Sequence, residues 1–258
     1  MRGEFFKGVH QWELQTMDGK FAGKLPVFYY DNTSMTAVYT ASTAKVKKYL
    51  PHPDMHPAEI FPGRCLVGFS AFEYRRTDIG PYNEFSISII IIFGRKGIPA
   101  LSILPQIMRR HFNVYIWHLP VTTEIARTAG VEFYGYPKFI AEIAFKREKD
   151  CLECRLSEKG SHILTLRGKH LDAKPGKIMR FKTYSVKNGI PICANIDTNP
   201  IEFVESWRRN SATIEIGSNH SISHELNGIE LSKQPILYQY SPVNELILFG
   251  ARNLRDNQ

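Results

Sequence analysis

Hydrophobic residues along the chain gather into short runs separated by turn-forming residues, a pattern typical of β-strands. The most apolar run covers residues 84–93, and a second run covers 67–74; both are rich in Phe and Ile. A Gly-Arg-Lys-Gly turn at 94–97 leads from the first of these into another apolar segment at 98–104. This arrangement predicts a β-hairpin made of 84–93 and 98–104.

The rest of the chain predicts further strands and a few short helices. Strands are expected at 139–145, 151–157, 162–166, 179–186 and 245–249. Helices are expected at 42–50, at 122–129 with Gly130 in a left-handed position after the last turn, and at 199–209 with Asn199 as N-cap and Pro200 in the first turn. The spacing of strands and turns fits a meandering antiparallel sheet better than βαβ units. The predicted fold class is therefore α+β, mostly antiparallel β, with a large sheet that curls or closes.

The chain shows no internal repeat and no long Pro/Gly/Ser linker, so residues 1–258 are expected to form a single domain. The apolar run at 87–93 is far shorter than the ~20 residues that a membrane-spanning helix needs. The N-terminal segment has no continuous apolar core followed by small residues, as a secretory signal would have. A cytoplasmic protein is the expectation from these features.

The charge balance permits an anionic partner. The 33 Lys and Arg residues exceed the 25 Asp and Glu residues, for a formal net charge of +8. Basic residues are scattered along the chain, and no recognition-helix, RRM, KH or zinc-finger pattern accompanies them. The sequence therefore predicts neither a nucleic-acid nor a membrane partner, and it favours a small anionic molecule.

Cysteine and histidine spacing does not point to a metal or redox centre. Cys151 and Cys154 have the C-x-x-C spacing, but no second pair completes a set of four ligands. His220 and His224 would share one face of a helix, and they too lack a third ligand. We expect no bound metal and no cofactor.

Lys138 is the most informative residue, because it follows Pro137 directly and lies among aromatic residues. One interpretation places its stem along aromatic surface with the ammonium group in water. The other keeps the amine in an apolar pocket, where loss of hydration favours the neutral, nucleophilic form. Glu84 begins the most apolar strand, and a carboxylate there is costly to bury unless it is protonated or paired. If Glu84 and Lys138 face one cavity, they form an amine with an acid/base partner.

Two motifs resemble the acetoacetate decarboxylase family: Gly135-Tyr136-Pro137-Lys138 after a short helix and a glycine, and Pro81-Tyr82-Asn83-Glu84. The resemblance extends over about 25–250. It implies a cone-like β-barrel with peripheral helices, an internal cavity, a homo-oligomer and a small keto acid as substrate. It also implies that Lys138 forms a Schiff base with the substrate ketone; the activated lysine of acetoacetate decarboxylase is itself the reference example of this chemistry. Glu84 would then handle protons around the imine. Five further residues are candidates for contact with the substrate: Tyr82, Tyr136, Phe139, Phe69 and Arg76.

Three positions depart from the family pattern. The second lysine that follows the Schiff-base lysine is replaced by Phe139, an upstream acidic residue falls at Phe69, and an arginine expected to meet the substrate carboxylate falls near Asn32. The scaffold and the nucleophile are kept, while the groups that handle the carboxylate are not.

Three functions follow from this set of residues. The first is decarboxylation of an acetoacetate-like β-keto acid through a Lys138 Schiff base. The second keeps the Schiff base and changes the reaction to aldol cleavage, condensation or dehydration of a pyruvate-like keto acid. The third is a non-enzymatic barrel that binds a small ligand, with Lys138 as a positive anchor.

Overall fold

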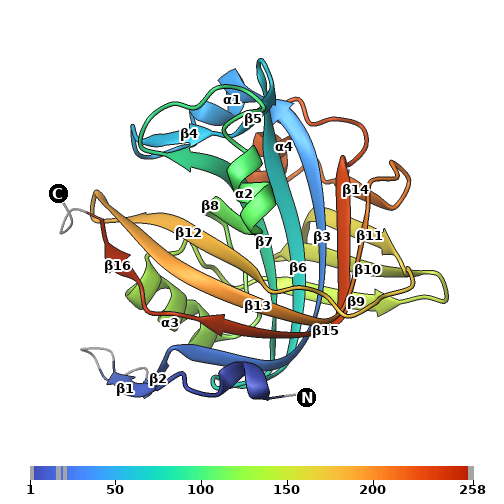
Figure 1. The fold of residues 1–258 in the computed structure, drawn as a ribbon. Coiled ribbons are helices and arrows are strands. Elements are labelled where there is room, and N and C mark those ends of the chain that lie inside the picture. The colour runs from blue at the N-terminus through green and yellow to red at the C-terminus, as the bar shows by residue number, and fades with distance from the viewer. Residues whose placement is uncertain (1–2, 16–18, 20–21, 255–258) are drawn as a thin grey trace.

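Seven strands close into a barrel in the computed structural model, which describes residues 3–15, 19 and 22–254. In order around the barrel they are β7 (Tyr82–Phe93), β8 (His111–His118), β12 (Met179–Lys187), β13 (Ile190–Ser206), β15 (Leu237–Leu248), β3 (Val27–Ser42) and β6 (Arg64–Thr77) (Figure 1). Pairing of β6 with β7 closes the ring. The β8–β12 pair is parallel and the other pairs of the ring are antiparallel. The expectation of a mostly antiparallel sheet that closes is confirmed.

A second sheet packs against the outside of the barrel, beside β3 and β6 (Figure 1). Its strands, in order, are β14 (Ala212–Ile216), β11 (Ser161–Lys169), β10 (Cys151–Glu158) and β9 (Glu142–Arg147). The largest hydrophobic core lies between the two layers and includes Tyr39, Phe69 and Ile87 of the barrel with Leu152 and Leu164 of the second sheet. Shorter strands complete the fold: β1 (Trp12–Gln15), β2 (Ala22–Leu25), β4 (Met55–Pro57), β5 (Glu59–Phe61) and β16 (Arg252–Asn253).

Successive side chains of a strand point to opposite faces of its sheet. On β3, β6 and β7 one set of alternate residues enters the core between the sheets, as Phe69 does, and the other set faces the barrel interior, as Gly68 and Ser70 do. The interior set does not fill the barrel, and a cavity of about 450 Å³ remains. The alternation of residues along these three strands therefore determines both the core between the sheets and the lining of the cavity.

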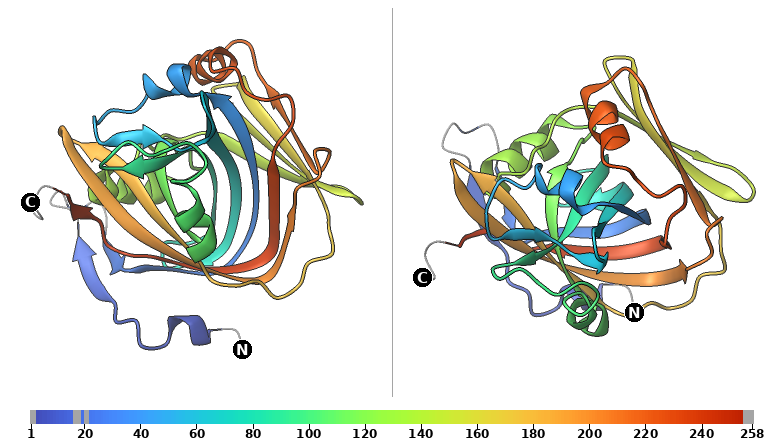
Figure 2. Two further views of the ribbon diagram at one scale, coloured as in Figure 1. Left: turned by 45° about the horizontal axis from the view of Figure 1, so that its top comes forward. Right: turned by 90° about the horizontal axis from the view of Figure 1, so that it is seen from above.

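Helices lie around the barrel: α1 (Thr43–Lys47), α2 (Leu104–Arg109), α3 (Glu124–Tyr134), α4 (Ser221–Gly228) and the short 3₁₀ helix η1 (Glu4–Phe6). In Figure 2, left, α2 stands at an open end of the barrel. Gln106 fastens it there, because its amide donates to the Ile91 carbonyl at 3.0 Å and accepts from the Asn113 N–H at 2.7 Å. In the described part of the chain, no helix is long and apolar enough to cross a membrane.

Three local predictions are wrong. Residues 98–104 form turns that lead into α2, and the strand that pairs with β7 is β8. Residues 199–209 lie mostly in β13, where a register shift at Pro200 accommodates the residue that cannot donate to the ladder. Helix α3 runs past Gly130 to Tyr134, and Gly135 is the residue with left-handed conformation, at φ 58°.

Candidate active site

Lys138 and Glu84 form a buried ion pair. The Lys138 Nζ donates to Glu84 Oε2 at 2.6 Å, and the two side chains are only 6% and 9% exposed. An amine and a carboxylate removed from water in this way can exchange a proton with little movement of heavy atoms.

The backbone brings the two residues together through Val121. Val121 forms a bridge with Glu84 on one side and with Ile140 on the other. The segment that carries Lys138 is held further by the Tyr136 N–H, which donates to the Gly130 carbonyl at 3.1 Å, and by the Lys138 N–H, which donates to the Tyr136 carbonyl at 2.7 Å. These bonds fix the lysine backbone next to the first residues of β7.

Gly130 leaves room for the stem of Lys138. A Cβ placed on Gly130 would lie 2.3 Å from Lys138 Cδ and 2.5 Å from Cε. Glycine in the interior of a helix is unfavourable by about 0.5–1 kcal/mol relative to alanine. The glycine in α3 is therefore explained by the passage of the lysine side chain across this turn of the helix.

Four tyrosines enclose the ion pair: Tyr29, Tyr74, Tyr82 and Tyr136. Tyr74 Oη donates to Glu84 Oε1 at 3.3 Å, and the Lys138 ammonium lies 5.7 Å from the centre of the Tyr82 ring. Burial, and then the Glu84 carboxylate, raise the pKa of Tyr74 and of Tyr82 well above 10. The phenols keep their protons, so they act as hydrogen-bond donors and not as bases.

The ion pair lies at one end of the 450 Å³ cavity, and α2 lies at the other end, where Ile103 and Ile107 line it. Four charged residues belong to the cavity lining: Glu84, Lys138, Arg110 and Glu205. Arg110 follows α2 directly and precedes β8, so it belongs to the end away from Lys138. Lys138 is thus the cation at the tyrosine-lined end, within the described lining.

The structure brings some of the predicted site residues together and separates others. Tyr136 lines the cavity and Tyr82 lies against Lys138. Phe69 does not line the cavity: it is fully buried in the core between the sheets, edge-on to Tyr39 at 5.7 Å between ring centres. Phe139 packs against the same core.

The other two predicted positions, Arg76 and Asn32, also lie outside the cavity lining. Arg76 is exposed, with its guanidinium 5.1 Å from the centre of the Tyr30 ring. The neighbouring arginine, Arg75, pairs with Asp31 at 2.8 Å. Asn32 is fully buried and donates to the Asn244 carbonyl at 2.9 Å, so it holds two strands together.

Sequence reasoning missed the hydroxyl side chains of the cavity. Ser34, Thr36, Ser70, Ser86 and Ser88 all line it. The alternation of Ser and Ile in residues 86–89 is the signal that would have revealed them, since one face of that strand carries hydroxyl groups and the other aliphatic groups.

Cys154 and His220 have roles in packing and helix capping. Cys154 is fully buried in the core between the sheets, and the four cysteines are free thiols. His220 caps α4 by accepting from the Ile222 N–H at 3.2 Å. Within residues 3–15, 19 and 22–254, no group of three His, Cys, Asp or Glu side chains converges as a metal site would require.

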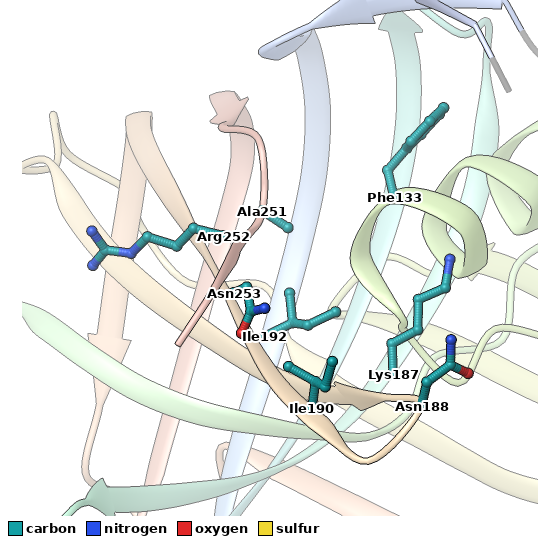
Figure 3. Close-up of a pocket in the computed structure, with 8 residues that line it drawn as sticks. All are labelled: Phe133, Lys187, Asn188, Ile190, Ile192, Ala251, Arg252 and Asn253. Atoms are coloured by element: carbon teal, nitrogen blue, oxygen red, sulfur yellow. The ribbon is translucent and has the colours of Figure 1, made fainter. Parts of the chain in front are cut away.

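A second, smaller pocket of about 210 Å³ lies outside the barrel, between α3, the β12–β13 turn and the segment 251–253 (Figure 3). Its cations are already engaged: Lys187 donates to the Glu132 carbonyl at 2.6 Å, and Arg252 donates to Cys193 Sγ at 3.3 Å. It contains neither Lys138 nor Glu84. The barrel cavity is therefore the candidate active site.

Solved structures with the same architecture define the class of protein. An acetoacetate decarboxylase shares 17% identity, with a TM-score of 0.61 and coverage of 89% of each chain. The acetoacetate decarboxylase of Legionella pneumophila subsp. pneumophila str. Philadelphia 1 shares 13% sequence identity, with a TM-score of 0.60. The match covers 89% of the present chain and 87% of the Legionella chain. The enduracididine biosynthesis enzyme MppR, solved in complex with pyruvate, shares 10% sequence identity, with a TM-score of 0.68. The match covers 96% of the present chain and 100% of the MppR chain. The fold is that of the acetoacetate decarboxylase-like barrels.

The sequence model of the acetoacetate decarboxylase (ADC) family matches residues 16–242. The chain therefore belongs to the acetoacetate decarboxylase family. No curated protein matches the sequence significantly. The family includes enzymes, and the particular reaction of this chain is a separate question.

Proposed function

We propose that this protein is a Schiff-base lyase that decarboxylates a β-keto acid. The observation that carries the proposal is the buried contact of 2.6 Å between Lys138 Nζ and Glu84 Oε2 at the tyrosine-lined end of the cavity. A nucleophilic amine with a base in hydrogen-bond reach is the arrangement that imine formation needs.

The proposed reaction starts with transfer of a proton from the Lys138 ammonium to Glu84. The neutral amine adds to the substrate ketone. The Glu84 acid then returns its proton to the departing hydroxyl group, so water leaves and a protonated imine remains. The bond between the α-carbon and the carboxylate then breaks, its electrons move into the imine, and CO₂ leaves with an enamine on Lys138. Glu84 takes up one proton from solvent and passes it to the enamine carbon, and hydrolysis of the resulting imine releases the ketone and restores the Lys138 ammonium. The sum is one β-keto carboxylate and one proton converted to one ketone and one CO₂.

The distribution of charge favours decarboxylation over chemistry on pyruvate. A pyruvate-derived enamine keeps its carboxylate through the reaction, and a buried anion needs a lasting partner. The carboxylate of a β-keto acid leaves as neutral CO₂, so the imine itself is the only cation that the step requires. The described lining at the Lys138 end offers no second cation, with Arg110 at the far end of the cavity.

Borohydride trapping followed by mass spectrometry tests the Schiff base. The protein is treated with acetoacetate, with longer β-keto acids and with pyruvate, and Lys138→Ala is the control. A reduced adduct on Lys138 together with CO₂ release from a β-keto acid is the expected result. Absence of an adduct with every keto acid contradicts the Schiff-base mechanism. If only pyruvate is trapped, if the protein consumes pyruvate only when an aldehyde is present, and if no CO₂ is released, then aldol chemistry is supported in place of decarboxylation.

A further inference from the structure

The cavity is much larger than a four-carbon keto acid requires. Its 450 Å³ lie within the ~300–1,000 Å³ of pockets that bury drug-sized ligands. The reacting groups occupy only one end, and the cavity continues between the strands toward α2. The chemistry proposed above leaves most of this space without a role.

One wall of the cavity carries a strip of hydroxyl groups, made of Ser34, Thr36, Ser70, Ser86 and Ser88. Thr36, Ser70 and Ser86 stand opposite one another on three neighbouring strands, because β3 pairs Thr36 with Ser70 and β6 pairs Ser70 with Ser86. The Thr36 and Ser70 hydroxyls are 2.8 Å apart. The strip therefore crosses the wall as a continuous row.

Several of these hydroxyls have no partner in the protein. In the described part of the chain, the side chains of Ser34, Ser86 and Ser88 make no hydrogen bond to another residue, and Ser86 and Ser88 are each only 8% exposed. A hydroxyl group that bonds to a bound ligand contributes on the order of 0.5–1.5 kcal/mol to binding. These hydroxyl groups open on the cavity and are free to hydrogen-bond a ligand that enters it.

Gly68 keeps space open next to the strip. It lies inside β6, where glycine weakens a strand, and a Cβ there would lie 3.1 Å from Ser88 Oγ. Glycine at such a position often marks a site where a ligand approaches the backbone closely. The missing side chain at Gly68 therefore leaves room for a ligand against the same wall.

The opposite wall is mainly apolar, and its two threonines, Thr183 and Thr198, already donate to the carbonyls of Ala194 and Met179. It is formed by β8, β12 and the adjoining part of β13, with the lining residues Val114, Ile116, Phe181 and Ile196. The cavity is therefore two-sided, with hydroxyl groups facing hydrocarbon across the space that leads from Lys138 toward α2.

We propose that the substrate is a β-keto acid with an extended chain that carries a neutral oxygen, as a hydroxyl or keto group, on the edge facing the hydroxyl strip. This inference rests on the proposed Schiff-base function and adds the class of substrate. The strip begins ~7 Å from Glu84, since Glu84 and Ser86 are two residues apart on β7. The oxygen belongs several carbons beyond the ketone, and it is neutral because the strip contains no charged residue. The hydrocarbon edge of the chain lies on the aliphatic wall.

Kinetics with a graded series of substrates tests this. Values of kcat/KM are measured for acetoacetate, 3-oxohexanoate, 3-oxooctanoate and 7-hydroxy-3-oxooctanoate. Burial of each added methylene is expected to raise kcat/KM about fourfold. The 7-hydroxyl is expected to add a further gain of about 2- to 10-fold over 3-oxooctanoate. Ser86→Ala should remove most of this last gain, while Ser157→Ala, a serine of β10 outside the barrel, should keep it.

A binding measurement separates this inference from the reaction. Calorimetry with octan-2-ol, which is neutral, has no ketone and forms no imine, is carried out on the wild type, on Lys138→Ala and on Ser86→Ala. Saturable binding that survives Lys138→Ala and weakens in Ser86→Ala supports the substrate class even if no keto acid is trapped on Lys138. Decarboxylation of acetoacetate with no rise in kcat/KM along the series, and no binding of octan-2-ol, overturns the inference and leaves the proposed function standing.

Discussion

Replacement of Gly130 by alanine tests whether the position of Lys138 depends on the helix that it crosses. Alanine favours the helix by about 0.5–1 kcal/mol, so the substitution on its own would stabilise α3. The new Cβ would lie 2.3 Å from Lys138 Cδ, whereas carbon atoms in contact are separated by about 3.5–4.0 Å. The lysine stem must therefore move by about 1 Å or more.

A displacement of 1 Å at a reacting group can lower a rate about 10²-fold, which corresponds to about 2.7 kcal/mol of activation free energy. We expect kcat for CO₂ release, and the rate of borohydride trapping, to fall by about this factor in Gly130→Ala. The melting temperature should change by no more than about 2–4 °C, the shift that accompanies about 1 kcal/mol in a protein of this size.

Gly228→Ala is the matched control. Gly228 ends α4, and a Cβ there would meet nothing within 4 Å. This variant should keep the rate of the wild type. Full activity of Gly130→Ala would show that Lys138 reaches the substrate by another path, and the role assigned to Gly130 would be refuted. A large loss of thermal stability in the same variant would show that the glycine serves packing in general.

Three other outcomes can be measured. Glu84→Gln keeps the size of the side chain and removes its charge, so kcat for CO₂ release should fall about 10²- to 10⁴-fold with the fold intact; a rate near that of the wild type would exclude Glu84 as the proton carrier. Burial lowers the pKa of His118 below 6.5 against the opposing effect of Glu225, so the unfolded chain binds more protons as pH falls through 6.5 and stability declines. His118→Gln should make this decline in melting temperature less steep, and an unchanged slope would contradict the assignment. Phe69→Ala should lower the free energy of unfolding by about 3–5 kcal/mol, measured in denaturant, while activity per folded molecule stays near that of the wild type.

The sequence predicts the strands better than the ends and connections of the elements. Alternating and apolar runs locate β6, β7, β10, β11 and β12 within a few residues. Asn199 followed by Pro200 is a good helix start by local rules, yet pairing with β15 extends β13 through both residues. Tertiary pairing there outweighs local capping preference, which is worth only about 1 kcal/mol.

In the candidate active site, short motifs predict some residues, while others depend on contacts between strands. Lys138 and Glu84 are recognisable from their motifs, and the structure places them in contact. Phe69 could not be placed correctly, because a shift of one residue along a strand turns a side chain from the cavity to the core. The alternation at 86–89 indicates the part of the hydroxyl strip on β7, but the strip as a whole depends on the register between β3, β6 and β7.

The alternation along β6 and β7 has a consequence for divergence and for engineering. Even-numbered residues, such as Ser70 and Ser86, line the cavity, while odd-numbered residues, such as Phe69 and Ile87, enter the core between the sheets. Changes of substrate range and changes of stability are therefore encoded at interleaved positions of the same strands. A library that varies only the even-numbered cavity positions of these strands, with Glu84 kept, should yield folded variants at high frequency. New substrate preferences would then arise by single substitutions on a scaffold whose core is left intact.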